Sequence, residues 1–542
     1  MTMLERLSFI LLAFSLVAGR AHAEFGVVSS ASPEATAAGV EVLEAGGNAI
    51  DAAIAVQFAL AVTEPAMSGL GGGTQIILKK PGEAPIVING TTFAPGLIPE
   101  SATRKQVQTG RTASTIPSTV RVFDFAYKKY GSGNIAWSAL LAPAIRYAEE
   151  GWVVGPFRAR VYRRHEEDLR SDSALAKLFL TEGKHAPREG EVVTMPVLGK
   201  TLRRLAEKGG MDFYTGDIAK EIAGDMAKHG GWITAGDLSA FPEPVVAPAL
   251  ATTYRGYGVY SLRPPAGGWA VLQALNILER EPLDRLNKEG DARYRALLRA
   301  LRAAHGSRRN APIGGGTSPG EAESLEAQIT KQTAAALWKK SGGETTHFSI
   351  VDKDGMIVAV TTSINRYFGA WAASPKLGFL YNNYMAEFET DAPDHPFALK
   401  PSAAPLSSMS ASIVTKDGEP LLVVGSPGSA RIISAVTQVI SHFLDVGKGV
   451  GAAVAAERVH ALPDDKAYME ARLISPTLLK TLADDGFSLQ SPDQDLVIDG
   501  LNAYFGGVHA IGKEELGWRG AADPRRDGTV GYANEGGWTP QP

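Results

Sequence analysis

The chain of 542 residues contains no cysteine. Disulfide bonds, cysteine-bound zinc, iron–sulfur clusters and thiol nucleophiles are therefore excluded. The net charge is also small: 54 Lys and Arg residues against 58 Asp and Glu residues give −4. A protein that binds polyanions usually carries an excess of positive charge, so the sequence does not indicate one. The 59 glycines and 32 prolines follow no Gly-X-Y period, which excludes collagen. With 44% hydrophobic and 21% charged residues, the composition is that of an ordinary globular protein.

The sequence also has no long hydrophobic run, and its clearest short one lies near the start. Arg6 precedes an apolar stretch at residues 8–19, and Ala21-His22-Ala23 follows as a small-residue cleavage signature. This order is typical of a secretory signal peptide over residues 1–23. The alternative, a membrane anchor, would need roughly 20 apolar residues. We therefore expect an exported, soluble protein, and the bacterial pattern of the signal indicates the periplasm.

The pattern of the remaining chain changes at a linker. Before it, residues 34–61 have helical spacing and residues 74–78 are strand-like. Residues 314–324, rich in Gly, Ser and Pro, form the predicted linker. Four strand-like stretches follow, the first two of them around the hairpin signal Asp354-Gly355: residues 346–351, 356–362, 406–414 and 421–425. This mixture of helices and strands predicts one layered α/β or α+β domain.

The predicted hairpin brings hydroxyl residues together. A turn at Asp354-Gly355 places Thr345 opposite Thr362, Ser363 or Ile364, at the open end of the hairpin beside the linker. If the Thr345 hydroxyl attacks the carbonyl group before it, the chain is cut in front of this residue. The new α-amine, with a pKa of about 8, can then act as general base for the same hydroxyl. A Thr-Thr pair at a strand start is usually structural, so this chemistry needs further support.

Ordered motifs along nearly the whole mature chain give that support. They are Gly46-Gly47-Asn48-Ala49-Ile50-Asp51-Ala52-Ala53, Glu64-Pro65, Ser68-Gly69-Leu70-Gly71-Gly72-Gly73, Leu141-Ala142-Pro143-Ala144-Ile145, Pro264-Pro265-Ala266-Gly267-Gly268, Thr345-Thr346-His347-Phe348-Ser349-Ile350-Val351-Asp352, Pro405-Leu406-Ser407-Ser408-Met409-Ser410 and Gly425-Ser426-Pro427-Gly428. In this order they resemble the γ-glutamyltranspeptidase family of N-terminal nucleophile hydrolases. The resemblance implies an α+β fold, a four-layer αββα sandwich, from a precursor that cuts itself between Glu344 and Thr345. The products would be a large subunit, residues 24–344, and a small subunit, residues 345–542, which stay associated as one composite domain.

The resemblance also implies the catalytic residues. Thr345 matches the nucleophile, and Ser363 matches a helper hydroxyl that is threonine in typical members. The backbone N–H groups of Gly428 and Ser429 match the pair that forms the oxyanion hole. Typical members have two glycines there. Because only the N–H of Ser429 is needed, we expect the hole to be retained.

The substrate-binding positions match the family less closely. Asn365 corresponds to a residue that holds the glutamyl head group, and Ser407 and Ser408 correspond to the pair that binds its α-carboxylate. Glu387 takes the place of an amine-binding Asp, so its carboxylate would reach one methylene further. Tyr384 takes the place of a Gln or Glu. The machinery for amide attack is thus expected to be intact, and the recognition pocket to be altered.

The clearest departure from the family is at Thr91. Typical members have an Arg there that pairs with the substrate α-carboxylate, whereas a threonine cannot make this charged contact. Losing one partner of a buried charge pair costs roughly 2–5 kcal/mol. Either Arg366 supplies the missing cation, or the substrate is not a free γ-glutamyl compound. The short segment 389–404 also implies that the lid loop of several members is missing.

Three hypotheses follow, of which we favour the first. It is an exported amidase or transpeptidase acting on γ-glutamyl compounds such as glutathione, with water or an amine as acceptor. The second keeps the chemistry on another acyl group, as in cephalosporin acylases or poly-γ-glutamate-processing enzymes. The third is an unprocessed, inactive scaffold. We expect no cofactor, no metal and no nucleic-acid partner, and residues 69–73 lack the Lys-Ser/Thr of a phosphate-binding loop.

Overall fold

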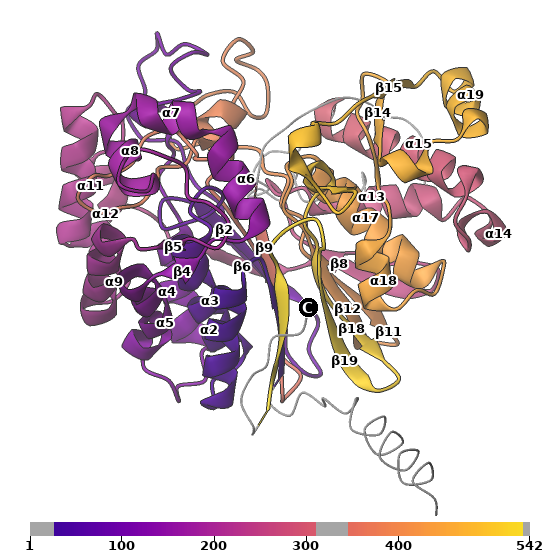
Figure 1. Cartoon of the computed structure of the whole chain (residues 1–542), viewed down its shortest axis with the longest axis horizontal. Coiled ribbons are helices and arrows are strands. Elements are labelled where there is room, and N and C mark those ends of the chain that lie inside the picture. Colours follow the sequence, from indigo (N-terminus) through magenta and orange to yellow (C-terminus); the bar gives the residue numbers. More distant parts are fainter. Residues whose placement is uncertain (1–25, 311–344, 535–542) are drawn as a thin grey trace, which may run out of the picture.

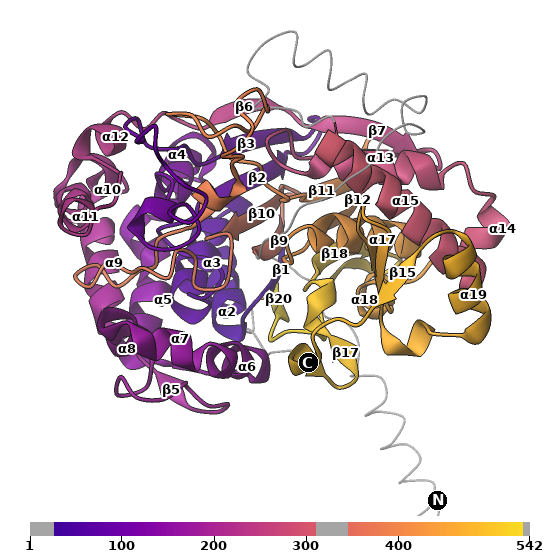
Figure 2. The ribbon, with the colours of Figure 1, turned by 90° about the horizontal axis from the view of Figure 1, so that it is seen from above.

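The structure is a computed structural model, and it describes residues 26–310 and 345–534. Two antiparallel sheets stack face to face between two helical layers, which confirms the predicted four-layer α+β sandwich (Figures 1 and 2). The predicted leader, the predicted linker and Glu344 lie outside the described residues.

The first sheet has seven strands, and its centre is the predicted hairpin. In spatial order the strands are β20 (Thr529–Ala533), β1 (Gly26–Ser30), β9 (Thr346–Asp352), β10 (Ile357–Ser363), β2 (Gly73–Lys79), β3 (Ile86–Gly90) and β6 (Val245–Pro248). Strands β9 and β10 pair with each other and are flanked by β1 and β2, all antiparallel. Every residue of both strands is buried, as expected for the middle of a covered sheet.

The second sheet has six strands. In spatial order they are β19 (Gly517–Ala522), β18 (His509–Glu514), β12 (Glu419–Gly425), β11 (Ser412–Lys416), β8 (Tyr257–Ser261) and β7 (Leu250–Tyr254). Apolar side chains of the two sheets, such as Ile77, Ile413, Val423 and Ile511, form a core between them. Three small sheets lie at the margins: β13 (Val459–Ala461), β14 (Lys466–Met469) and β15 (Ser488–Gln490); β16 (Val497–Ile498) and β17 (Leu501–Asn502); and β4 (Trp152–Val153) and β5 (Val192–Val193).

Each sheet is covered on its outer face by helices with a core of their own. Over the seven-stranded sheet lie α2 (Pro33–Glu44), α3 (Ala49–Thr63), α4 (Thr119–Tyr130), α5 (Trp137–Glu150), α6 (Pro156–Arg164), α7 (Glu166–Ser171), α8 (Ser173–Phe179), α9 (Pro196–Lys208), α10 (Asp212–Thr215), α11 (Asp217–Lys228) and α12 (Ala235–Ser239). Over the six-stranded sheet lie α13 (Gly268–Leu278), α14 (Leu283–Leu286), α15 (Asp291–Asn310), α17 (Arg431–Leu444), α18 (Val450–Ala455) and α19 (Pro476–Asp484). The two groups stand on opposite sides of the sheets in Figure 1.

Helix α3 is central to the position of the hairpin. All of its residues are buried, and its first turn is closed by a capping box between Asn48 and Asp51. The Ala49 N–H donates to the Asp352 carboxylate at 2.9 Å, while the N–H groups of Asp354 and Met356 donate to the other oxygen of that carboxylate. One carboxylate therefore holds both the hairpin turn and the start of α3.

Two sequence predictions of local structure are wrong. Residues 34–61 form two helices, α2 and α3, because Gly46 adopts a positive φ of 86° and Asn48 starts a new helix. The strand predicted over residues 406–414 begins only at Ser412. Before it, the Ser407 hydroxyl accepts from the Met409 N–H and the Ser410 hydroxyl donates to the Ser408 carbonyl, and such local bonds compete with sheet pairing.

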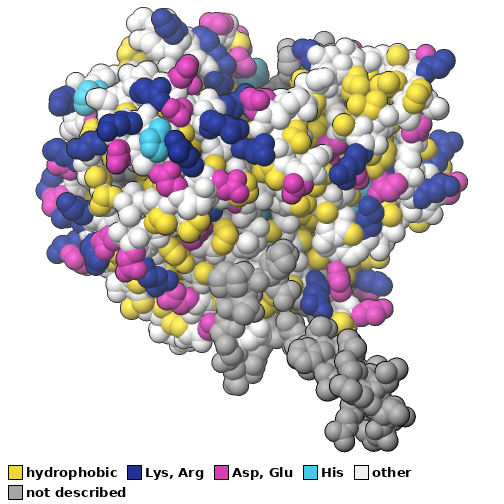
Figure 3. Space-filling view, viewed as in Figure 1, with side chains coloured by type: hydrophobic (Ala, Val, Ile, Leu, Met, Phe, Trp, Pro, Cys, Tyr) yellow, Lys and Arg dark blue, Asp and Glu magenta, His cyan; other side chains and the backbone are white. Residues whose placement is uncertain are grey.

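On the face drawn in Figure 3, basic and acidic side chains are interspersed, as the small net charge suggests. Within residues 26–310 and 345–534, no helix combines the length and the apolar character needed to cross a membrane.

Candidate functional site

Thr345 lies directly before β9 and is 5% exposed. In the hairpin, Thr346 pairs with Thr362, so continuing the register by one residue places Thr345 opposite Ser363. This is the middle one of the three pairings that the hairpin geometry allowed. Ser363 is also paired with Gly73 of β2 on its other side, which fixes its backbone. The structure thus brings the predicted nucleophile and the predicted helper hydroxyl together.

Ser363, Tyr384 and Ser407 form a cluster of hydroxyl groups. The Tyr384 hydroxyl interacts with both serine side chains, and burial raises the pKa of this tyrosine. Tyr384 comes from a 3₁₀ turn, η3 (Tyr384–Glu387), and Ser407 from the irregular segment before β11. Residues far apart in the sequence therefore converge beside the start of β9. Tyr384 and Ser407 line a cavity of about 10 Å³, which we call the site cavity, together with Gly73, Gly90 and Thr91; Thr345 is not among its described lining residues.

Asn365 and Glu387 contact each other next to Ser363, the last residue of β10. The Asn365 Nδ2 donates to the Glu387 Oε1 at 3.1 Å and to the Asn383 carbonyl at 3.2 Å. The Asn365 N–H donates to the Ser363 hydroxyl at 2.7 Å. Its φ of +79° belongs to the left-handed region, which asparagine tolerates better than most residues. The arrangement presents one carboxylate and one amide, the groups suited to an ammonium ligand.

Ser408 is half-buried next to Ser407, and its carbonyl oxygen accepts from Ser410 at 2.8 Å. The Ser407 N–H donates to the Pro265 carbonyl at 3.0 Å. This hydrogen bond joins the segment that carries both serines to the Pro-Pro-Ala-Gly-Gly motif at the start of α13. The two motifs are far apart in the sequence and are neighbours in the fold.

Thr91 and Arg366 are differently placed. Thr91 is half-buried and lines the site cavity. Arg366 is exposed, and its Nη1 donates to the Gln108 Oε1 at 2.9 Å. Arg366 is not among the described residues that line the site cavity. In this conformation its guanidinium is engaged elsewhere.

Gly428 and Ser429 lie between β12 and α17, at φ values of +121° and +62°. The end of β12 is close to the nucleophile strand, since a Cβ on Gly425 would lie 2.2 Å from the His347 ring. Gly428 and Ser429 both precede α17, whose N-cap is Ala430, so their N–H groups lie just ahead of the helix end where the dipole favours negative charge. The Ser429 hydroxyl is buried and has no hydrogen-bond partner within the described part of the chain.

His347 is close to the nucleophile but is not placed as a base. Its Nδ1 is 3.0 Å from the Thr361 hydroxyl and its Nε2 is 3.1 Å from the Ser349 hydroxyl. Burial lowers the pKa of His347 well below its ordinary value, so the ring stays neutral. Both ring nitrogens are occupied within the strand pair, which gives this histidine a structural role.

Glu64 is a residue whose place in the site the sequence analysis missed. The Thr346 hydroxyl donates to its Oε2 at 2.6 Å, directly beside Thr345. Burial raises the pKa of Glu64 to about 7, and the charges of Arg526 and Arg158 offset only part of that effect. A signal was present, because Glu64 ends a helix that is apolar on all sides, and an acid in such a place is expected to be buried.

Comparison with known proteins agrees with this geometry. The family model described as "Gamma-glutamyltranspeptidase" matches residues 35–533. The chain is 34% identical over 511 residues to "Glutathione hydrolase proenzyme" of Escherichia coli (strain K12), with 86% of each chain covered. It is 32% identical over 549 residues to a protein of the same name from Pseudomonas sp. (strain A14), with 93% of each covered.

Among solved structures, the cephalosporin acylase from Bacillus halodurans superposes with a TM-score of 0.83 at 28% identity, covering 94% of this chain and 96% of that one. The family match spans nearly all described elements, from α2 to β20. The chain therefore belongs to the gamma-glutamyltranspeptidase family of hydrolase and transferase enzymes.

Proposed function

We propose that this protein is an autoprocessed γ-glutamyl amide hydrolase and transpeptidase that uses Thr345 as its nucleophile. The observation that carries the proposal is the register of β9 and β10, which sets Thr345 opposite Ser363 inside a buried strand pair. Glutathione-like γ-glutamyl compounds are the proposed donors, by similarity to the glutathione hydrolase proenzymes.

Maturation begins when the Thr345 hydroxyl attacks the carbonyl carbon of Glu344. The peptide C–N bond breaks, an ester forms, and the nitrogen becomes the free α-amine of Thr345. Water then hydrolyses the ester and leaves two chains, residues 24–344 and 345–542, after removal of residues 1–23. The α-amine, with a pKa of about 8, is afterwards the general base for the hydroxyl of the same residue.

In the mature enzyme the same hydroxyl attacks the γ-carbonyl of the donor. The developing oxyanion is stabilised by the N–H groups of Gly428 and Ser429, just before α17, and one such donor is worth about 3–4 kcal/mol. The leaving amine takes the proton that the α-amine removed from the Thr345 hydroxyl. Water or an acceptor amine then resolves the acyl ester, with the Ser363 hydroxyl as helper.

Recognition of the donor uses the groups around the site cavity. Ser407, which lines this cavity, and its neighbour Ser408 bind the α-carboxylate, while Asn365 and Glu387, outside the lining, meet the α-ammonium. Tyr384 keeps the Ser363 and Ser407 hydroxyls in place. At Thr91 the pocket offers a neutral hydroxyl.

The neutral Thr91 also supports a second candidate function, an acylase for amides with another acyl group. The similarity to a cephalosporin acylase over 94% of the chain favours it. The chemistry at Thr345 would be the same, and only the donor would differ. In both cases we propose export to the periplasm, directed by residues 1–23, and no requirement for a cofactor or metal.

The first experiment is to produce the mature protein beside Thr345→Ala and to determine chain masses and N-terminal sequences. We expect two chains, the smaller one starting Thr345-Thr346-His347, and a single uncut chain for the variant. Two chains from Thr345→Ala would show that the nucleophile is another residue. Release of p-nitroaniline from γ-glutamyl-p-nitroanilide by the processed protein then separates the two functions, since no release contradicts a γ-glutamyl donor.

A further inference from the structure

A second, larger cavity adjoins the site cavity. It has a volume of about 370 Å³, within the range of small-molecule sites, and we call it the side cavity. Gly90 and Thr91 line both cavities, so these two residues mark the junction. Both cavities therefore border the end of β3.

Apolar atoms make up somewhat more than half of the walls of the side cavity, and Thr91, Ser118 and Ser402 add neutral polar groups. Phe93 and Phe241 contribute two rings whose centroids are 5.8 Å apart, and Val122 and Val245 add aliphatic surface. Pro396 and Ala403 come from the short segment 389–404, which the Ala94 N–H holds through the Ala403 carbonyl at 2.9 Å. The segment thus forms one wall of the side cavity.

The charge of the side cavity argues against an anionic occupant. Among the described residues that line it there is no Lys, Arg or His, and its charged side chain is Glu243. The carboxylate of Glu243 lies 3.5 Å from the Arg121 guanidinium, on the exposed rim. A carboxylate entering the cavity would meet no cation among the described lining residues, because Arg121 is paired with Glu243, and it would lose its hydration, whereas an apolar group gains by leaving water.

We propose that the side cavity binds a neutral, apolar, ring-sized substituent carried by the acyl donor, at the end where free glutamate has its α-carboxylate. This inference rests on the proposed cleavage of γ-linked amides at Thr345, and it replaces the proposed α-carboxylate at Ser407 and Ser408 by an uncharged group in the preferred donors. The preferred donors are then γ-linked amides whose acyl part is extended and uncharged at that end. Thr91 sets this preference, because a short neutral side chain leaves the junction open.

The test compares two p-nitroanilides that differ at one group: γ-glutamyl-p-nitroanilide, with its free α-carboxylate, and the α-benzylamide of the same compound. We expect kcat/KM of the processed enzyme to be at least tenfold higher for the benzylamide. Ala403→Trp fills the side cavity and should abolish the preference. Thr91→Arg, which closes the junction and adds a cation, should reverse it. Leu97→Trp, at a surface position 74% exposed, is the matched control and should keep the ratio of the parent enzyme.

Cleavage in front of Thr345 is checked first for each variant, because it reports a folded precursor. Should Ala403→Trp fail this check, Val245→Trp at the cavity rim takes its place. A higher kcat/KM for the free acid, or a ratio that neither Trp variant alters, overturns the side-cavity assignment and leaves the γ-glutamyl function standing. A processed enzyme that cleaves neither compound overturns both the proposed γ-glutamyl donor and this inference.

Discussion

At the scale of single residues, Glu64 carries the clearest consequence for stability. Its pKa is raised to about 7 by burial, against 4.5 for an unperturbed glutamate. The native state therefore binds a proton more tightly than the unfolded state, and the associated stabilisation is complete below pH 4.5 and is lost as the pH rises through about 7. We expect up to about 3 kcal/mol of stability to disappear over this interval.

Glu64→Gln tests this expectation, because glutamine imitates the protonated acid and can still accept from Thr346. The thermal midpoint of the variant should change less between pH 5 and 8 than that of the parent. Glu41→Gln, on the surface, serves as control and should follow the parent profile. Identical pH profiles for the parent and Glu64→Gln would mean that Glu64 is ionised throughout.

Ser429, at the proposed oxyanion hole, combines an unfavourable backbone angle with a hydroxyl group that the described residues leave unsatisfied. Its φ of +62° disfavours a side chain, and its hydroxyl is buried without a partner in the described part of the chain. Each feature costs about 1–3 kcal/mol. Ser429→Gly should therefore raise stability to denaturant by at least about 1 kcal/mol after the greater chain entropy of glycine is subtracted. Ser429→Ala removes only the hydroxyl and should gain less. If both variants are destabilised, the serine side chain contributes a contact of its own.

Arg366 is the cation that the sequence analysis offered in place of the missing family Arg. Its guanidinium is exposed and bound to Gln108, so we expect Arg366→Ala to change KM for γ-glutamyl-p-nitroanilide less than about threefold. Gln108→Ala, which frees the guanidinium, is the companion variant. A rise in KM above about tenfold in Arg366→Ala would indicate that the side chain turns into the site when substrate binds, as one lost charge contact would produce.

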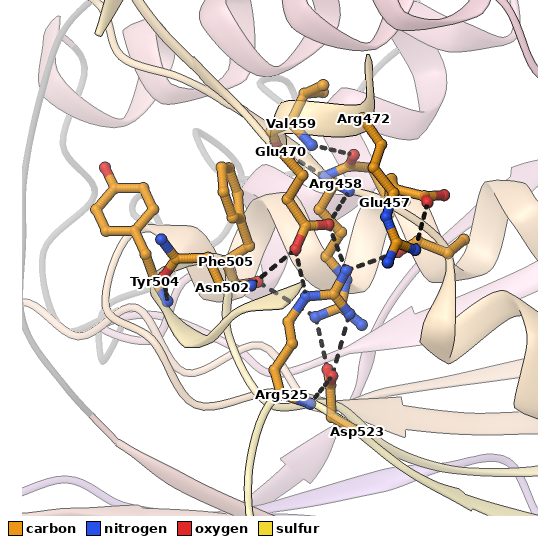
Figure 4. A network of polar contacts seen from close by, with 12 residues as sticks. Glu457, Arg458, Val459, Glu470, Arg472, Asn502, Tyr504, Phe505, Asp523 and Arg525 are labelled. Carbon is orange, nitrogen blue, oxygen red and sulfur yellow. Dashed lines mark hydrogen bonds and ion pairs between the residues drawn. The ribbon is translucent and has the colours of Figure 1, made fainter. Parts of the chain in front are cut away.

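At the scale of elements, a buried network joins Arg458, just before β13, and Glu470, just after β14, to the loop after β19 (Figure 4). Arg458 donates to Asp523 at 2.6 Å, and Arg525 donates to both Asp523 and Glu470, with all four side chains buried. Although burial alone would raise it, the two arginine charges hold the pKa of Asp523 at about 2. The stabilisation from this carboxylate is thus present above pH 4 and lost as the pH falls through about 2.

If one member of this network is replaced by an uncharged residue, the charges that it paired with stay buried without that partner. Arg525→Met should therefore destabilise the protein by about 3–5 kcal/mol, seen as a lower denaturation midpoint. Arg472→Ala is the control, because Arg472 is 62% exposed and its pair with Glu457 at 3.6 Å should contribute less than about 1 kcal/mol. Equal effects of the two substitutions would mean that the network relaxes around the gap.

The elements also show what the sequence could predict. The hairpin at Asp354-Gly355 was predictable because its turn signal and its β-branched, apolar strands are local, and the position of the turn limited the partner of Thr345 to three residues. The site beyond it depends on contacts between distant segments. Nothing local predicts that the Tyr384 hydroxyl meets Ser407, or that Thr346 donates to Glu64. Family resemblance supplied most of those positions, but not the contact of Glu64 with Thr346 or the cavity beyond Thr91.

At the scale of the whole molecule, the proposed subunits share both sheets. In the seven-stranded sheet, β9 and β10 of the small subunit stand between β1 and β2 of the large one. In the six-stranded sheet, β11 of the small subunit pairs with β8 of the large one. Cleavage before Thr345 leaves all these pairings in place, since the cut lies ahead of the first residue of β9. The two chains are therefore parts of one core.

This architecture predicts that the processed chains separate only on unfolding. After cleavage, both chains should elute together in size-exclusion chromatography, at the mass of one large and one small subunit or a multiple of it. They should do so equally at 1 M NaCl, because strand pairing and apolar packing between the sheets are not screened as surface charge pairs are. Denaturant should release both chains in the same transition that unfolds the sheets, followed by circular dichroism. Dissociation by salt alone would contradict the shared-sheet interface and would require a polar contact between separately folded subunits.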